Sequence, residues 1–330
     1  MSKGLVTLIG GSGFLGRYAA RALVRAGWRV RVACRNPHAA GDVRLAGPPG
    51  WVDLVQANVR NRASLERAVA DADAVVNLVG ILFERGKQTF DGSQASGARL
   101  AAGAALAAGV TRYVQISAIG ADAESDSAYA RTKAEGEAAV RDVFPDAVVL
   151  RPSIVFGPED QFFNRFAQLA RFAPALPAIG GGRTRLQPVY AGDVADAIRA
   201  AVERHDVAGQ TYELGGPRVY TFSELYDFIF ETIDRKRFKA PLPYVVAKPM
   251  GSLMAGTWRY VPPFAWGLFG DPPLTGDQVE MLKQDNVVAD GALTLADLGV
   301  TELESVEALV PTYLWRFRPY GQFHQKGDAA

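Results

Sequence analysis

Cysteine and histidine are scarce in this chain. Among 330 residues there are one cysteine, Cys34, and three histidines, at positions 38, 205 and 324. A single cysteine cannot form an internal disulfide, and four scattered soft ligands do not have the spacing of a structural zinc site. These absences exclude a disulfide-stapled secreted domain, predict no metal site, and favour a reducing compartment such as a cytosol or an organelle matrix.

An excess of charge of either sign is also missing. The 36 basic and 35 acidic side chains leave a net charge of +1, so no global field attracts nucleic acid, and we expect no nucleic-acid partner. No apolar run reaches about 18 residues; the nearest stretch, 245 to 269, is broken by Lys248, Arg259 and three prolines. The N-terminus lacks the pattern of an export leader, so we expect neither secretion nor a membrane span, although a surface contact with a membrane stays open.

The hydrophobic pattern of the first half predicts a parallel sheet. Short runs that are apolar at nearly every position alternate with helix-length amphipathic segments, which is typical of strands buried on both faces. The expected strands are Leu5–Ile9, Val30–Ala33, Val52–Val55, Ala74–Val79, Tyr113–Ile116 and Ala147–Leu150. The order predicts an α/β fold, a Rossmann-type doubly wound parallel sheet.

After Arg151 the rhythm changes and strands become sparse. Helical patterns are expected at Phe162–Phe172, Asp193–Arg204 and Phe222–Ile233, separated by glycine-rich turns. We therefore predict a nucleotide-binding Rossmann domain over residues 1–151 and a smaller C-terminal α/β lobe over 152–330, with a returning segment at 185–215 completing the first domain.

A glycine loop follows the first expected strand directly. Gly10, Gly11, Gly13 and Gly16 surround Ser12, Phe14 and Leu15 and open the first expected helix. Glycine allows a tight turn, lets backbone amides approach a pyrophosphate and lets helix and strand pack closely, while the helix N-terminus faces the negative charge. This context predicts a dinucleotide site.

The residue that reads the adenosine ribose should lie about 20 positions further on, at the end of the second strand. The sequence there is Cys34-Arg35-Asn36, without an acid. A guanidinium pairs with a 2′-phosphate, whereas an acid would bind a free 2′-hydroxyl. Arg35 therefore favours NADPH over NADH, the alternative being a solvated arginine at a strand end.

Tyr129 and Lys133 are spaced by four in a predicted helix over 127–141, so they share one face. A nearby cation favours the phenolate form of a tyrosine, and such a pair can relay a proton to or from a carbonyl. The same spacing is also common on ordinary helix surfaces. The glycine loop and the preceding strand favour the catalytic interpretation.

With these motifs the chain resembles the short-chain dehydrogenase/reductase superfamily, in its extended and atypical branches, over residues 4 to 215. The segments from Leu150 to Pro158 and from Val189 to Ala195 share this likeness. The resemblance implies an acid-base role for Tyr129, a ribose contact for Lys133 and a third catalytic residue, for which Ser117 is the candidate. It also implies cofactor contacts at Gly10, Ser12, Gly13, Phe14, Leu15, Gly16, Arg35, Asn58, Val59, Leu78, Val79, Gly80, Ser117, Tyr129, Lys133, Pro152 and Ile154.

Two positions depart from the pattern of that superfamily. Asn58 stands where an acid often binds adenine, although its amide oxygen is still an acceptor. Ser117 lies one or two places before the usual catalytic serine or threonine, and Ala118 and Ile119 occupy the expected positions. Strand side chains alternate between the two faces of a sheet, so a shift of one residue points the hydroxyl to the other face. The shift therefore places the turnover of a substrate in question, while cofactor binding is unaffected.

Within the superfamily the chain is similar to the family of a nucleotide-binding accessory subunit of respiratory complex I, the NADH dehydrogenase alpha subcomplex subunit nine family. The segments that carry this are 13–18, 76–82, 134–145, 151–164 and 274–288. The resemblance implies a tightly held NADPH, partners among the subunits of the peripheral arm, and a peripheral position on the cytoplasmic face of a bacterial inner membrane, or on the matrix side in a mitochondrion.

Two aromatic segments agree with docking on a partner or a membrane surface. They are the stretch 243–269 and the tail 313–323, which interleaves five aromatic residues with two arginines. The alternative is that these aromatics fill the core of the smaller lobe. Three functions stay open: a non-catalytic accessory subunit of NADH:ubiquinone oxidoreductase, a free NADP(H)-dependent oxidoreductase or epimerase acting on a carbonyl or sugar-nucleotide, and a redox-sensing regulator.

Overall fold

The computed structural model describes residues 2–258, 272 and 274–323. It divides into two compact units: one comprises residues 1–152, 191–215 and 288–302, and the other residues 153–190, 216–287 and 303–330. The division differs from the sequence-based one at three places. Pro152 and residues 288–302 belong to the first unit, and residues 185–190 belong to the second. Residues 259–269 of the predicted aromatic segment and His324 lie outside the described residues.

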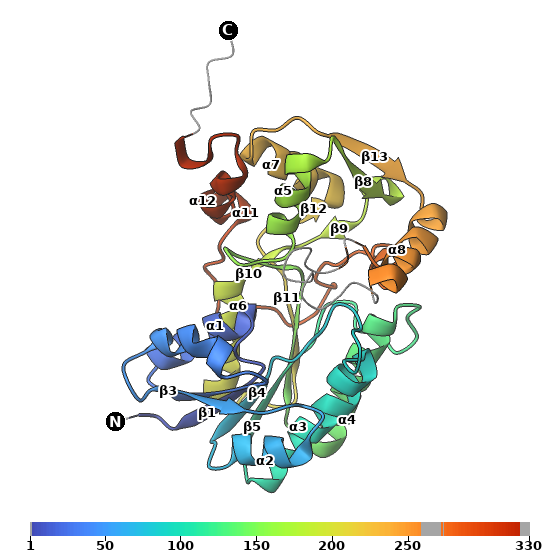
Figure 1. Cartoon of the computed structure of the whole chain (residues 1–330). Helices are drawn as coiled ribbons and strands as arrows, with labels where there is room; N and C mark the ends of the chain where they lie inside the picture. The colour runs from blue at the N-terminus through green and yellow to red at the C-terminus, as the bar shows by residue number, and fades with distance from the viewer. Residues whose placement is uncertain (1, 259–271, 273, 324–330) are drawn as a thin grey trace. The chain divides into compact units, whose positions relative to one another are not determined.

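A seven-stranded parallel sheet forms the centre of the first unit (Figure 1). Its strand order is β11-β6-β5-β4-β1-β2-β3, and every neighbouring pair is parallel. The strands are β1 (Leu5–Ile9), β2 (Arg29–Cys34), β3 (Val52–Gln56), β4 (Ala74–Asn77), β5 (Arg112–Ile116), β6 (Val148–Pro152) and β11 (Thr211–Leu214). This order confirms the predicted Rossmann-type doubly wound fold.

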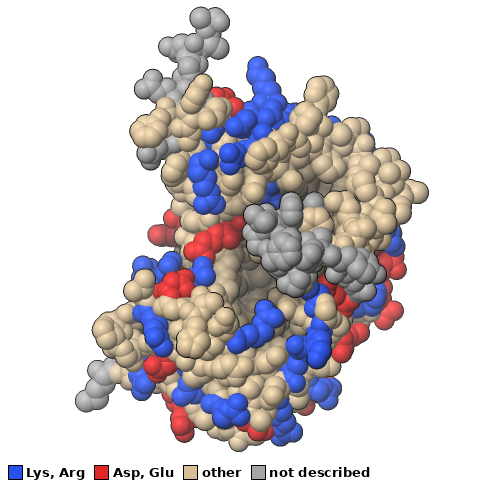
Figure 2. All heavy atoms as spheres, viewed as in Figure 1, with Lys and Arg blue, Asp and Glu red and all other residues tan. Residues whose placement is uncertain are grey.

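Helices cover both faces of this sheet (Figure 1). On one face α1 (Phe14–Arg25) packs against α6 (Ala191–Glu203). On the other, α3 (Ser96–Ala107) lies between α2 (Arg62–Val69) and α4 (Ala128–Val143). Short 3-10 turns form η1 (His38–Ala46), which follows β2. In Figure 2 basic and acidic side chains are interspersed over the visible surface of this unit, in keeping with its balanced composition.

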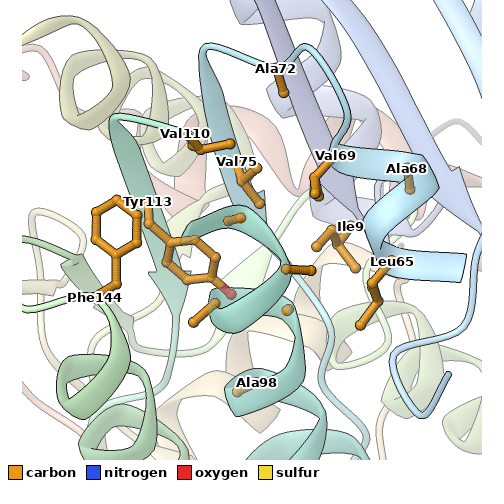
Figure 3. Close-up of a cluster of buried hydrophobic side chains, with 14 of the residues drawn as sticks. Ile9, Leu65, Ala68, Val69, Ala72, Val75, Ala98, Val110, Tyr113 and Phe144 are labelled. Atoms are coloured by element: carbon orange, nitrogen blue, oxygen red, sulfur yellow. The ribbon is translucent and has the colours of Figure 1, made fainter. Parts of the chain in front are cut away.

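The core between the sheet and α2, α3 and α4 combines large strand residues with small helix residues (Figure 3). Ile9, Val75 and Tyr113 project from the strands, while α3 contributes alanines such as Ala98 that allow a close approach of helix and sheet. Burying the methyl and ring groups removes apolar surface from water, at about 25 cal/mol per Å². This burial fixes α2, α3 and α4 against the sheet from which the site residues extend.

Two predicted boundaries shift for local reasons. The strand expected at Ala74–Val79 ends at Asn77, whose Oδ1 accepts the N–H of Val79 at 3.2 Å and so begins a turn. The alanine-rich stretch 94–108 has the length and composition of a helix, but this helix begins instead as a π-helical turn, η2 (Asp91–Ala95). An added Cβ at Gly136 of α4 would lie 2.3 Å from the carbonyl oxygen of Gln94, so η2 and α4 pack backbone to backbone.

The second unit is built from helices and short strand pairs. Its strands are β7 (Val155–Phe156), β8 (Ala175–Ile179), β9 (Arg185–Leu186), β10 (Val189–Tyr190), β12 (Tyr220–Thr221) and β13 (Phe238–Leu242). Its helical elements are α5 (Phe163–Phe172), η3 (Gly180–Gly182), α7 (Phe222–Thr232), α8 (Tyr244–Trp258), α10 (Gly276–Met281), α11 (Val306–Leu309), α12 (Pro311–Leu314), η4 (Trp315–Phe317) and η5 (Gly321–Phe323). The smaller α/β lobe is thus confirmed.

The C-terminal tail is only partly a surface feature. Tyr313 and Phe317 belong to the aromatic core of the second unit, whereas Trp315, Tyr320 and Phe323 are exposed. The Tyr313 hydroxyl donates to Asp160 at 2.6 Å, and Asp160 also accepts the backbone N–H of Gly157 and Asn164. Two of the five aromatic residues of the tail therefore fix it in the fold, and the other three face solvent.

Candidate cofactor site

The glycine loop joins β1 to α1 and leaves no room for a Cβ atom at several of its positions, among them Gly10 and Gly16. Gly10 has a φ of +80°, and an added Cβ there would lie 2.9 Å from Cγ2 of Val79. An added Cβ at Gly16 would lie 2.4 Å from the backbone oxygen of Gly11, so helix and loop are in direct backbone contact. Gly13 is different, because its nearest neighbour would be 3.5 Å away. Gly10 and Gly16 allow close packing within the protein, whereas the open space beside Gly13 could be occupied by a ligand.

The N-terminus of α1 is free to receive an anion. Gly13 is its N-cap residue, no side chain caps it, and its first turn carries no acid. The first backbone amides of a helix have no partner within the helix and carry partial positive charge. Phe14 and Leu15 are half-buried, and Phe14 packs edge-on against Tyr18 at 5.6 Å between ring centroids. The loop thus has the geometry of a phosphate cradle.

The ends of β2 and β3 carry the predicted ribose and adenine contacts. Arg35 is exposed and donates from Nη1 to Oε1 of Gln88 at 2.7 Å. Asn58 already accepts the backbone N–H of Arg60 at 3.1 Å, so its oxygen has one lone pair left for adenine, and Val59 packs against Gly97. The buried Cys34 thiol is hydrogen-bonded to the side chain of Ser12 in the glycine loop, and burial raises the pKa of this thiol.

Lys133 occupies a tight, buried position. Its Nζ donates to the carbonyl of Ile116 at 3.3 Å and lies 5.8 Å from the centroid of the Tyr129 ring, which packs edge-on against Phe90. An added Cβ at Gly80 would lie 3.2 Å from this Nζ. Burial lowers the pKa of Lys133 to about 8, and the negative charge of Glu137 opposes that shift. Tyr129 and Lys133 thus lie close to each other in the structure, and Lys133 lies beside Ile116 at the end of β5 and Gly80 after β4.

Sequence reasoning missed the ion-pair network behind Lys133. Glu137, one turn further along α4 and 5% exposed, forms a two-pronged pair with Arg151 of β6 at 2.9 and 2.7 Å. Arg151 also lies 3.6 Å from Glu213 of β11, whose other oxygen accepts the N–H of Ala289 at 2.9 Å. The pair with Glu137 raises the pKa of Arg151. The four-residue spacing that links Tyr129 to Lys133 also links Lys133 to Glu137, so this signal was present in the sequence.

Two buried polar atoms next to this network have no hydrogen-bond partner in the described part of the chain. They are Oγ of Ser117, which directly follows β5, and Oε1 of Gln94 in η2. Gln94 uses its amide nitrogen to donate to the carbonyl of Ile81 at 3.0 Å. Buried polar atoms are rarely left unpaired, so both atoms suit a site that a polar ligand completes. The π-helical turn that places Gln94 has no sequence signal.

Most predicted cofactor contacts follow the carboxyl ends of the first six strands of the sheet. Gly10 to Gly16 follow β1, Arg35 follows β2, Asn58 and Val59 follow β3, Leu78 to Gly80 follow β4, Ser117 follows β5, and Pro152 ends β6. The exceptions are Tyr129 and Lys133, which lie in α4, and Ile154, which belongs to the second unit. Among the described residues no group of three or more histidine, cysteine, aspartate or glutamate side chains is arranged to hold a metal.

The comparisons with known proteins show the family of the chain. Residues 6–215 match the family model of the NAD dependent epimerase/dehydratase family. The chain belongs to this family. The rat protein "NADH dehydrogenase [ubiquinone] 1 alpha subcomplex subunit 9, mitochondrial" is 35% identical over 319 residues, which cover 94% of the chain and 81% of that protein. The predicted family resemblance is confirmed, because this relative covers nearly the whole chain.

Two further likenesses concern reductases. The "Ceramide reductase" of Caulobacter vibrioides is 34% identical over 203 residues, 60% of the chain and 61% of that protein. A solved structure of the Citrobacter sp. triphenylmethane reductase complexed with NADP(H) aligns with a TM-score of 0.69 at 18% identity, over 95% of the chain and all of that protein. At this identity the second likeness shows the fold alone. The glycine loop, the uncapped helix and the family together support a nicotinamide nucleotide cofactor.

Proposed function

We propose that this chain is an NADPH-binding accessory subunit of NADH:ubiquinone oxidoreductase, in which the cofactor mainly stabilises the fold. The observation that carries the proposal is the 94% coverage of the chain by a relative that is named as a subunit of NADH dehydrogenase. The site adds the reason for the cofactor: an uncapped helix N-terminus, unpaired Ser117 and an exposed Arg35 at the ribose end.

A bound dinucleotide would hold several separate segments together. The glycine loop would take the pyrophosphate, Arg35 the 2′-phosphate, and Lys133 a ribose hydroxyl. When bound, the nicotinamide supplies a hydride donor or acceptor. A ligand that binds only the folded state adds stability by mass action, about 4 kcal/mol at a thousandfold excess over its dissociation constant. Such a ligand supports assembly without any turnover.

An exposed apolar stripe on α8 supports docking on a partner subunit or a membrane surface. Val246, Met250 and Leu253 are spaced by four and three, which aligns them on one helix face, and they are 52%, 38% and 69% exposed. Few charged atoms lie over α8 in Figure 2. No described helix is both long enough and apolar enough to cross a membrane. The exposed stripe supports our proposal of a peripheral position, near the junction of the peripheral arm with the membrane.

The test is co-purification with membrane-bound complex I in mild detergent. We expect the chain to follow the complex, and Leu253→Asp to reduce that association at least about fivefold, while Leu106→Asp, at a 53% exposed position of α3 in the first unit, leaves it unchanged. If the wild-type chain stays in the soluble fraction and does not co-purify with the complex, the proposal is wrong.

A free NADP(H)-dependent oxidoreductase is the second candidate, since the paired Tyr129 and Lys133 have the contacts that such chemistry uses. In that function Tyr129 exchanges a proton with a carbonyl oxygen and Lys133 orients the ribose. The variant Tyr129→Phe separates the two functions. We expect complex assembly to be unchanged, whereas loss of a measurable carbonyl-dependent NADPH oxidation on this substitution would favour the oxidoreductase.

A further inference from the structure

A short segment after β4 forms a closed turn, which we call the strap (residues 84–90). The backbones of Arg85 and Gln88 exchange two hydrogen bonds, at 2.8 and 2.9 Å, around Gly86, which has a φ of +54°. Oε1 of Glu84 accepts the N–H of Phe90 at 2.9 Å and closes the base of the turn. The strap is thus a defined element rather than a simple connection to η2.

The strap reaches across the sheet to two other strand ends. Gln88 accepts a hydrogen bond from Arg35, which follows β2, and the carbonyl of Lys87 accepts one from Nη1 of Arg60, which follows β3. In the sheet β1 separates β4 from β2, and β3 lies one strand further. At about 4.8 Å per strand, β2 lies about 10 Å and β3 about 14 Å from β4, and the strap and the two arginine side chains bridge this distance together. The bridge joins strand ends on both sides of β1, after which the glycine loop begins.

This arrangement gathers cations from three strand ends. Arg35, Arg60 and Lys87 are exposed, and Arg85 of the strap is half-buried. In the described part of the chain no ion pair joins Arg35, Arg60 or Lys87 to a carboxylate, and Glu84 uses one of its oxygens to close the strap. Like charges held together without a counter-ion favour an anion, and guanidinium groups bind the oxygens of a phosphate in a charge-assisted fork.

We propose that Arg35, Arg60 and the strap cation Lys87 together form the binding site for a phosphate monoester, the 2′-phosphate of the adenosine ribose. Gln88 is a positioning residue that holds the Arg35 guanidinium toward the strap. This inference rests on the proposed binding of NADPH and extends it: the preference for NADPH over NADH comes from a site closed by the strap, and not from Arg35 alone.

The test compares dissociation constants of NADPH and NADH, together with 2′-AMP and 5′-AMP as fragments, for the full chain and its variants. Lys87→Ala and Arg60→Ala should each raise the dissociation constants of NADPH and 2′-AMP at least about fivefold, since each substitution removes a charge-assisted contact. The dissociation constants of NADH and 5′-AMP should change by less than about twofold. Gln88→Glu should also weaken NADPH selectively, because the new carboxylate pairs with Arg35 and repels the phosphate. The matched control is Arg25→Ala, which removes an exposed cation from the far end of α1.

The outcomes separate this inference from the function it rests on. If Arg35→Ala weakens NADPH selectively and the strap variants do not, the strap site is wrong and NADPH binding stands. If the strap variants weaken NADPH and NADH equally, the strap covers the cofactor without reading its phosphate, which also overturns the inference. If the wild type binds neither dinucleotide, the proposed function fails as well.

Discussion

Replacing Glu137 by glutamine should change how the stability of the first unit depends on pH. Burial lowers the pKa of Lys133 to about 8 from its ordinary 10.5, so between these values the unfolded chain binds a proton that the folded chain does not. The free energy of unfolding therefore rises with pH across this window. The difference corresponds to about 3 kcal/mol, at about 1.4 kcal/mol for each pKa unit. Glu137 limits this effect, because its negative charge favours protonated Lys133.

The size of the change follows from the network. Side chains four residues apart on a helix lie about 6 Å apart, and opposite charges at that distance interact by about 3 kcal/mol at an effective dielectric constant of 20. Arg151 pairs with Glu137 and opposes much of this attraction. We therefore expect Glu137→Gln to move the start of the stability rise down by about one pH unit, with a further loss of stability near pH 7.

Urea unfolding between pH 6 and 10 measures this effect, with Lys133→Met as the reference background. Glu137→Gln also breaks the two-pronged pair with Arg151, but that loss is present in both backgrounds and cancels in a double-mutant cycle. The pH-dependent difference between glutamate and glutamine at 137 should disappear when Lys133 is absent. If the difference persists in the Lys133→Met background, another group titrates and the reasoning is refuted.

Three further predictions concern packing and unpaired groups. Gly16→Ala should destabilise the chain by about 2 kcal/mol or more and abolish dinucleotide binding, because the added Cβ would clash with backbone atoms. Gly103→Ala in α3 should stabilise the chain by about 0.5–1 kcal/mol, because a Cβ there would have no neighbour within 4 Å. Thermal unfolding measures both effects. Ser117→Ala should leave the stability of the ligand-free chain within about 0.5 kcal/mol or raise it and weaken NADPH binding, and an unchanged dissociation constant would exclude a ligand contact for this hydroxyl. Asp160→Ala should cost about 2–4 kcal/mol in denaturant unfolding, because two backbone N–H groups and the Tyr313 hydroxyl lose their acceptor, and Tyr313→Phe should cost about 1 kcal/mol; equal costs would contradict this account.

Local sequence patterns were enough for the parallel sheet and for part of the site. Fully apolar runs at regular intervals predict strands that are buried on both faces, and the sheet contains each of the six expected in the first half. Gly10 and Gly16 are required by backbone geometry that any sequence with this turn must satisfy. Tyr129 and Lys133 share a face because helical spacing alone brings them together.

Other features depend on contacts between segments far apart in the chain. Glu137 becomes part of the site through Arg151 and Glu213, which come from two other strands, and the π-helical turn at Gln94 follows from its close packing on Gly136. Tyr313 and Phe317 enter the core of the second unit, although their sequence context resembles that of the exposed tail residues. Periodicity cannot distinguish such residues, because burial depends on what packs against them.

The scarcity of cysteine and histidine and the balanced charge limited, from sequence alone, which kinds of site are expected in this protein, and the glycine loop determined where a dinucleotide is expected. The tertiary structure decided how charge is distributed around that site. A chain with a net charge of +1 brings Arg35, Arg60 and Lys87 together at one edge of its sheet and buries Lys133 beside Glu137. The physical reason is that the carboxyl ends of parallel strands meet at one edge, whatever their distance along the chain.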